Sequence, residues 1–244
     1  MPRQRELPPP PANPERSPPA TVAGEELVTI PGLPGEPSLE ARVRAPAAAT
    51  RAVVLCHPHP LYGGTMHSAV VLAIAKLLVE KGGERVAHLR FNYRGVGTSE
   101  GRYGEGRGEI EDARAAIRAL RERAPGAKMT MCGYSFGTFV GLRAAVREQD
   151  EQSDAIERVT LVAPAVRIFH FVKEDGARFQ GRLSIFVGDD DEFCDVAEAE
   201  ELAANLGAKL TVFPGADHYF LKSRRKLAEA VVPVAAPEAG ANAS

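Results

Sequence analysis

The sequence predicts an α/β fold, in which an open, mostly parallel, twisted sheet of about eight strands carries helices on both faces. Strand-like segments alternate with helix-like segments along most of the chain, after two short strands joined by a Pro/Gly turn. The run at residues 52–57 is almost continuously apolar, as expected for a strand buried on both faces of a parallel sheet.

The expected elements follow from these patterns in chain order. The strands are residues 26–30, 39–45, 52–57, 85–91, 128–132, 158–163, 183–187 and 209–213. The helices are residues 65–81, 109–123, 136–146, 195–206 and 221–231. Thr65 is the expected N-cap of the first helix, and Gly82 and Gly207 stand where glycine commonly ends a helix. In the second helix the acidic residues come first and the arginines last, which suits the helix dipole.

The length of 244 residues suits one domain with a substantial core. Residues 1–22 are rich in proline and polar residues and are expected to be a disordered tail. Residues 23–236 then form the single domain, and residues 237–244 a flexible C-terminal tail. The net charge of −2 favours neither nucleic acid nor a membrane as partner, and we expect a monomer or a homodimer.

The chain carries no pattern typical of secretion or of membrane insertion. Its three cysteines are too few for a disulfide framework, which favours a reducing compartment. Residues 1–20 lack the apolar segment of a signal peptide, and the longest apolar run, residues 69–75, is far shorter than a membrane span. The expected location is the cytoplasm.

Residues 133–137 read Gly-Tyr-Ser-Phe-Gly, the G-x-S-x-G pattern of a nucleophile elbow. In such an elbow a sharp turn raises a serine hydroxyl above the edge of a sheet, and the glycines let the strand and helix backbones approach closely. A short apolar segment precedes the pentapeptide and a helical pattern follows it, which is the context that the motif requires. Ser135 is therefore the candidate nucleophile of a hydrolase.

A serine nucleophile needs a base to take its proton and a third group to orient that base. Four consecutive acids, residues 189–192, follow one later strand, and His218 follows the last strand. The order Ser, Asp, His is the one that α/β-hydrolases show. Asp217 is adjacent to His218 and points elsewhere in most loop geometries, and Asp195 suits a helix N-cap.

An oxyanion formed during acyl transfer needs two backbone N–H donors. The amide of Phe136, at a helix N-terminus directly after the nucleophile, is the first candidate. The loop after residues 52–57 reads His-Pro-His-Pro-Leu-Tyr-Gly-Gly-Thr and should supply the second. Its two prolines have no N–H, so the amide of His59 is the leading donor, with Leu61 or Tyr62 behind it.

Two further patterns suggest sites that we do not expect. His57 and His59 are possible metal ligands, but no carboxylate or cysteine accompanies them at ligand spacing. Residues 92–99 are rich in glycine but lack the G-x-G-x-x-G spacing of a dinucleotide site, so no cofactor is expected. Arg94, within that segment, is interpreted as an anchor for its loop rather than as a clamp for a substrate carboxylate.

Two longer segments carry a family resemblance. Residues 57–66 read HPHPLYGGTM and residues 89–101 read LRFNYRGVGTSEG. With the elbow, they make residues 25–232 resemble the serine α/β-hydrolase superfamily, most of all the small bacterial branch related to dienelactone hydrolases. The resemblance implies the α/β-hydrolase fold.

The resemblance also implies roles for single residues. It makes Ser135 the nucleophile and His218 the base. The acid in this family usually lies three residues past a strand-ending glycine, which selects Asp191, with Asp190 next. Dienelactone hydrolases proper have a cysteine nucleophile, so their lactone substrate is not carried over to this chain.

The expected function is a carboxylesterase-like serine hydrolase that cleaves small or short-chain carboxylic esters through an acyl-enzyme, with no cofactor and no metal. Residues 165–182 are too few for a multi-helix lid, so we expect no large lid domain and an open site. The expected lining residues are Tyr62, Phe136, Phe193, Tyr219 and Phe220. The alternatives are a thioesterase or acyltransferase, a peptidase or amidase, and a non-catalytic binding protein on this fold.

Overall fold

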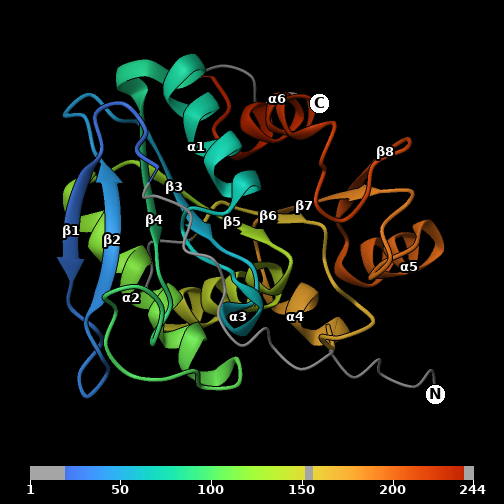
Figure 1. Ribbon diagram of the computed structural model, residues 1–244, viewed down its shortest axis with the longest axis horizontal. Helices are drawn as coiled ribbons and strands as arrows, with labels where there is room; N and C mark the ends of the chain where they lie inside the picture. Colours follow the sequence, from blue (N-terminus) through green and yellow to red (C-terminus); the bar gives the residue numbers. More distant parts are fainter. Residues whose placement is uncertain (1–19, 152–155, 239–244) are drawn as a thin grey trace.

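The predicted sheet is present in the computed structural model, which describes residues 20–151 and 156–238. Its eight strands lie in the order β1-β2-β4-β3-β5-β6-β7-β8 (Figure 1). They are β1 (Glu26–Ile30), β2 (Leu39–Arg44), β3 (Arg51–Cys56), β4 (Val86–Phe91), β5 (Lys128–Tyr134), β6 (Arg158–Val162), β7 (Arg182–Gly188) and β8 (Lys209–Phe213). Strand β2 pairs antiparallel with β1 and β4, and all other neighbours are parallel. The mostly parallel α/β fold is therefore confirmed.

Helices cover both faces of the sheet. They are α1 (Ala69–Gly82), α2 (Arg107–Arg123), α3 (Phe136–Glu151), α4 (Lys173–Arg178), α5 (Val196–Leu206) and α6 (Arg224–Ala235), with short 3-10 turns at Pro60–Tyr62 and Gly83–Arg85. Helices α1 and α6 lie side by side on one face, and α2, α3 and α4 lie on the other (Figure 1). Helix α5 packs on the same side as α2 and α3. Between β6 and β7, where every residue is described, the chain forms α4 and no multi-helix lid.

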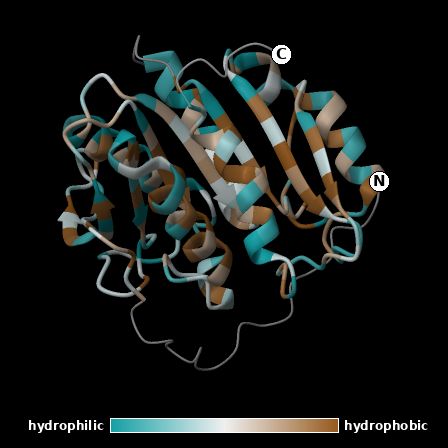
Figure 2. Ribbon diagram, turned by 90° about the horizontal axis from the view of Figure 1, so that it is seen from above, coloured by the Kyte–Doolittle hydropathy of each residue, from teal (hydrophilic) through white to brown (hydrophobic). Residues whose placement is uncertain are grey.

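The alternating geometry of the strands divides the core into two layers. Every residue of β3 is buried, and successive side chains point to opposite faces. Val54 packs in the layer under α2 and α3, whereas Val53 and Leu55 pack in the layer under α1 and α6. The apolar colouring of the central strands in Figure 2 reflects this double burial.

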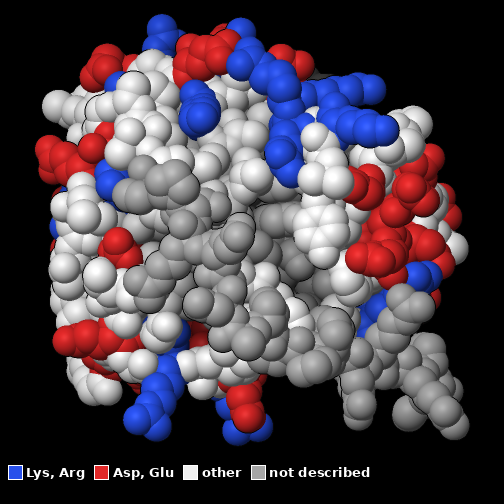
Figure 3. Space-filling view, in the orientation of Figure 1, with Lys and Arg blue, Asp and Glu red and all other residues white. Residues whose placement is uncertain are grey.

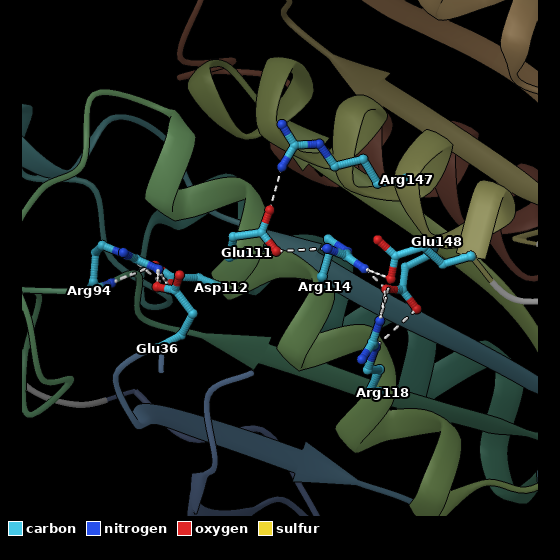
Figure 4. A network of polar contacts seen from close by, with 9 residues as sticks. Glu36, Arg94, Glu111, Asp112, Arg114, Arg118, Arg147 and Glu148 are labelled. Atoms are coloured by element: carbon cyan, nitrogen blue, oxygen red, sulfur yellow. Dashed lines mark hydrogen bonds and ion pairs between the residues drawn. The ribbon is translucent and has the colours of Figure 1, made fainter. Parts of the chain in front are cut away.

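Paired charges fix α2 to its neighbours (Figure 4). The buried carboxylate of Glu148 on α3 accepts hydrogen bonds from Arg114 and Arg118 on α2. The guanidinium of Arg94 donates to Asp112 on α2 at 2.7 Å and to Glu36 at 2.7 Å. The interpretation of Arg94 as a loop anchor is confirmed, because its charge is bound by these two carboxylates.

Helix α1 begins later than the sequence pattern predicts. The Met66 amide donates to the side chain of Asn92, and the Thr65 hydroxyl accepts from the His67 amide. These bonds make residues 65–68 a separate turn, so the helix begins at Ala69. The expectation of Thr65 as N-cap is wrong, because a contact outside the helix, with Asn92 directly after β4, decides where it starts.

Two other helices differ from the prediction. The Leu221 amide donates to the Asp217 carboxylate and the Ser223 amide to the Phe220 carbonyl, so turns replace the expected first residues of α6. Helix α6 begins at Arg224 and continues to Ala235. The six residues of α4 were not predicted, because so short a segment shows no helical periodicity.

The two predicted tails fall largely outside the described residues, which exclude 1–19 and 239–244. Within the described part, Val22 is buried in the core and the Ala20 carbonyl accepts a hydrogen bond from Arg90. At the other end, the Pro237 carbonyl accepts from Arg51. Among the described residues, we find no helix with the length and apolar character of a membrane span.

Candidate active site

Ser135 lies at the tight junction between β5 and α3. Its φ of +54° is in the left-handed region, which side chains other than glycine rarely adopt. A Cβ on Gly133 would lie 2.1 Å from the Gly137 carbonyl oxygen, and a Cβ on Gly137 would lie 2.4 Å from the Cys56 carbonyl oxygen. Both positions therefore require glycine, because the backbone of α3 in one case and the end of β3 in the other lies where a Cβ would be.

Ser135 stands at one end of a continuous hydrogen-bond chain. Its Oγ lies 3.0 Å from His218 Nε2, and His218 Nδ1 lies 2.8 Å from Asp191 Oδ2. An acceptor at Nδ1 places the imidazole proton on that nitrogen, which leaves Nε2 free to accept from the serine hydroxyl. The Asp191 carboxylate also accepts from the Phe193 amide at 2.8 Å, and the Tyr134 hydroxyl donates to the His218 carbonyl. Both His218 and Asp191 are buried.

The neighbouring acids take other positions. Asp189 accepts from the Gly215 amide, and the Asp190 amide donates to the Ala216 carbonyl, while both of these acidic residues are exposed. The structure thus brings Asp191, of the four consecutive acids, to the histidine. The Asp195 carboxylate caps α5, as the sequence pattern predicts.

The loop after β3 lies against the N-terminus of α3. The close approach of Gly137 to Cys56 places the start of this loop beside the first amides of the helix, which have no partner within it. The amides of Leu61 and Tyr62 bond back to His59, whereas the His59 amide makes no hydrogen bond within the described chain. The predicted donors, the amides of Phe136 and His59, therefore remain the two candidates.

The buried side chain of His57 fixes the start of this loop. Its Nε2 accepts from the Tyr93 amide at 3.1 Å, and its Nδ1 donates to the Pro58 carbonyl at 2.6 Å. Burial lowers the pKa of His57 to about 3, so the ring is neutral. In His59, Nδ1 accepts from Leu61 and Nε2 lies 3.0 Å from the Tyr103 hydroxyl. All four ring nitrogens are engaged within the protein.

The end of the loop is held by side chains from β4 and the residue after it. Asn92 accepts from the Met66 amide at 2.9 Å, and Arg90 donates to the Met66 carbonyl at 2.8 Å. Arg90 also donates to Glu25, and both side chains are fully buried. Burial alone would raise the pKa of Glu25, but hydrogen bonds from Arg90 and His88 lower it to about 2. The N-terminal segment is thereby connected to the loop.

A cavity of about 340 Å³ opens beside Ser135. Its remaining lining residues are Pro58, His59, Tyr62, Gly63, Gly64, Ser68, Ala69, Val70, Tyr134, Ala165, Ile168, Phe169, Phe193, His218, Tyr219 and Arg224. Aromatic and apolar side chains predominate, and no aspartate or glutamate is among these described lining residues. The shape and lining are those of a small-molecule site rather than of a flat binding surface.

Three of the five expected lining residues border this cavity, and two do not. Phe136 packs behind His59, with ring centroids 4.9 Å apart. The expectation for Phe220 is wrong, because its ring is fully buried in the core and lies 5.6 Å from the ring of Phe213. The left-handed backbone of Phe220, with φ of +49°, turns this side chain inward, and sequence spacing gives no sign of it.

Comparison with known proteins agrees with this architecture. Residues 47–172 match the family described as serine aminopeptidase, S33. The chain belongs to this family. An uncharacterised protein of Rickettsia prowazekii is 30% identical over 189 residues, which cover 73% of this chain and 75% of that protein.

Solved structures of hydrolases resemble this chain over most of its length. An α/β serine hydrolase without a lid from Xanthomonas campestris has a TM-score of 0.73 at 28% identity, and the match covers 89% of this chain and 95% of that one. A serine hydrolase homologue from Coxiella burnetii has a TM-score of 0.71 at 29% identity, covering 88% and 98%. A Pyrococcus furiosus esterase, at 17% identity, TM-score 0.68 and coverage of 90% and 96%, shares the fold. The protein is a serine hydrolase of the α/β fold.

Some residues that line the cavity were not predicted from the sequence. Ile168 and Phe169 lie between β6 and α4, where no motif marks them, and they reach the cavity because the chain returns over it. Arg224 opens α6, six residues after His218, and the sequence shows it only as part of a basic run. Their positions depend on the path of loops that carry no periodic signal.

Proposed function

We propose that this chain is a serine esterase that hydrolyses small or short-chain carboxylic esters. The observation that carries the proposal is the hydrogen-bond chain from Ser135 through His218 to Asp191 at the wall of a cavity of about 340 Å³. Nucleophile, base and orienting acid within hydrogen-bond reach of each other are the requirement for acyl transfer.

In the proposed reaction, His218 takes the Ser135 proton while Oγ attacks the ester carbonyl carbon. The amides of Phe136 and His59 stabilise the oxyanion. The C–O bond to the alcohol then breaks, and His218 returns the proton to the leaving oxygen, which forms the acyl-enzyme. Water, deprotonated by His218, attacks the acyl carbon, and release of the acid restores the serine. Asp191 holds the ring in the required tautomer and stabilises the imidazolium.

Cavity size and lining support small esters. Its volume of about 340 Å³ lies at the lower end of the range for ligand pockets, roughly 300–1,000 Å³. Apolar side chains such as Ile168 and Phe169 suit the short hydrocarbon part of such an ester. A long acyl chain would extend beyond this volume into water.

The family description also suggests a peptidase that binds a free amino terminus. An ammonium group in a site of low dielectric needs a negative partner. The described lining of the cavity holds no aspartate or glutamate, and Asp191 already binds His218 and the Phe193 amide. This electrostatic mismatch favours the esterase over the aminopeptidase.

The test is hydrolysis of p-nitrophenyl esters by the full chain. Ser135→Ala should lose activity, whereas Ser184→Ala, which changes a serine on β7 outside the cavity, should keep it. Intact mass spectrometry of wild-type protein quenched during turnover should show one acyl group, and that group should be missing in Ser135→Ala. Turnover should fall from butyrate to laurate. Full turnover by Ser135→Ala, or faster cleavage of aminoacyl anilides than of butyrate, would contradict the proposal.

A further inference from the structure

The cavity beside Ser135 contains one arginine whose charge has no partner in the described chain. Arg224, the first residue of α6, is half-buried and lines the cavity. Its Nε donates to the Tyr219 carbonyl at 3.3 Å, which ties the guanidinium to the loop that carries His218. Among the described residues it forms no ion pair, although its neighbour Arg225 pairs with Glu80 and Glu229.

The rest of the lining offers Arg224 no negative charge. The described lining contains neither aspartate nor glutamate. The imidazole of His59 is neutral near pH 7, because burial lowers its pKa to about 4. Partial burial and the charges of Glu192, Asp191 and Asp217 raise the pKa of Tyr219, but none of these three acids lines the cavity.

The side chains of Arg224 and Ser135 border the same cavity. Burial raises the pKa of Tyr134, the residue before the nucleophile, and the charge of Arg224 acts in the opposite direction. The first residues of α1 border the same cavity, and its first turn holds no acid. The field of that helix end therefore has the same sign as the arginine.

The surface around α6 is also positively charged. Basic side chains gather over the end of the molecule that carries α6, and acidic side chains gather over the region of α5 (Figure 3). The basic side chains near α6 would attract a negatively charged substrate toward that end of the molecule.

From this placement we infer that Arg224 selects esters that carry an anionic group, a carboxylate or a phosphate, remote from the ester bond. The inference rests on the proposed function. A planar guanidinium binds either group through paired N–H donors, and partial burial strengthens those bonds. The apolar walls would hold the hydrocarbon between the anion and the ester, whereas a cationic ester would be repelled.

The experiment compares anionic esters with neutral esters of matched length in a pH-stat. Monomethyl glutarate against methyl hexanoate tests an anion on the acyl side. Two acetate esters test an anion on the alcohol side, each against butyl acetate. The first, 3-acetoxypropanoate, carries a carboxylate, and the second, 2-acetoxyethyl phosphate, carries a phosphate. In at least one pair, Arg224→Met should lower the anionic-to-neutral ratio of kcat/KM by about 10- to 100-fold, the range of a lost charge-assisted hydrogen bond.

Two further variants make the result specific. Arg224→Lys keeps the charge but loses the planar fork, so its ratio should lie between those of the wild type and Arg224→Met. Arg225→Met removes an adjacent charge outside the cavity and should leave the ratio unchanged. Equal ratios in the wild type and both Arg224 variants for all three pairs would overturn the inference. Ser135→Ala distinguishes failure of this inference from failure of the proposed function, because retained hydrolysis in that variant would overturn the proposed function.

Discussion

The left-handed backbone of Ser135 predicts an unusual order of stability among its variants. Ser135→Ala and Ser135→Gly both remove the hydroxyl and its bond to His218, so their difference isolates the backbone. At φ of +54° a residue with a Cβ carries a strain of roughly 1–2 kcal/mol that glycine lacks. Against this, glycine lowers the free energy of unfolding by about 0.4–1 kcal/mol, because the unfolded chain has more conformational freedom at a glycine. The net expectation is that the glycine variant is the more stable by about 0.5–1 kcal/mol.

Urea unfolding of the two variants measures this difference, provided that their m values agree. Ala145→Gly on α3 is the matched control, because this buried alanine has no positive φ and glycine there should cost about 1 kcal/mol or more. Replacing alanine by glycine should therefore raise stability at position 135, where Ser135→Gly is compared with Ser135→Ala. The same replacement at position 145, compared with the wild type, should lower stability. Ser135→Ala at least as stable as Ser135→Gly would refute the idea that the elbow stores backbone strain.

Two further predictions concern the histidines and their partners. Asp191→Asn should lower kcat on p-nitrophenyl butyrate by on the order of 10³- to 10⁴-fold, because an amide no longer holds His218 in the required tautomer. Asp190→Asn, at an exposed position, should stay within about twofold, and similar losses in both would contradict the assignment. Buried His57, with its pKa lowered to about 3, takes up a proton only in the unfolded chain as pH falls below about 6.5, so this residue alone should lower stability by up to about 1.4 kcal/mol per pH unit. Urea unfolding at pH 6.5 and 5 should show stability falling with pH in the wild type and falling less in His57→Asn, in which His59 still contributes. Both pH values lie above about 4.5, below which the carboxyl of Glu25 contributes. Equal slopes in the two proteins would contradict the prediction.

The sequence predicts the sheet well because strands buried on both faces leave a local signal. The apolar run in β3 places that strand within one residue of where it lies, and the glycine spacing of residues 133–137 identifies the elbow. Helix starts were less predictable. Asn92, directly after β4, holds the Met66 amide, so the first residue of α1 depends on a contact 26 positions away.

The candidate site also contains residues that could be predicted from the sequence and residues that could not. Residues at the carboxyl ends of the strands are brought together by the topology, so Ser135 and His218 were predictable as neighbours. Asp191 followed from family resemblance rather than from any property that distinguishes it from Asp190. Arg224 and Phe169 line the cavity through loop paths, which chain patterns do not record.

The two segments that carry the family resemblance form one structural unit. Strand β4 pairs in parallel with β3, so the residues that end β4 lie beside the loop that follows β3. That loop contains two prolines, and its chain turns sharply enough that a Cβ on Gly64 would meet the Pro58 carbonyl at 2.1 Å. Within the loop, the Tyr62 and Gly64 amides donate to the His59 carbonyl. Its two ends are held from outside, His57 by the Tyr93 amide and Met66 by Arg90 and Asn92. We therefore expect a change in either segment to displace the peptide that presents the His59 amide.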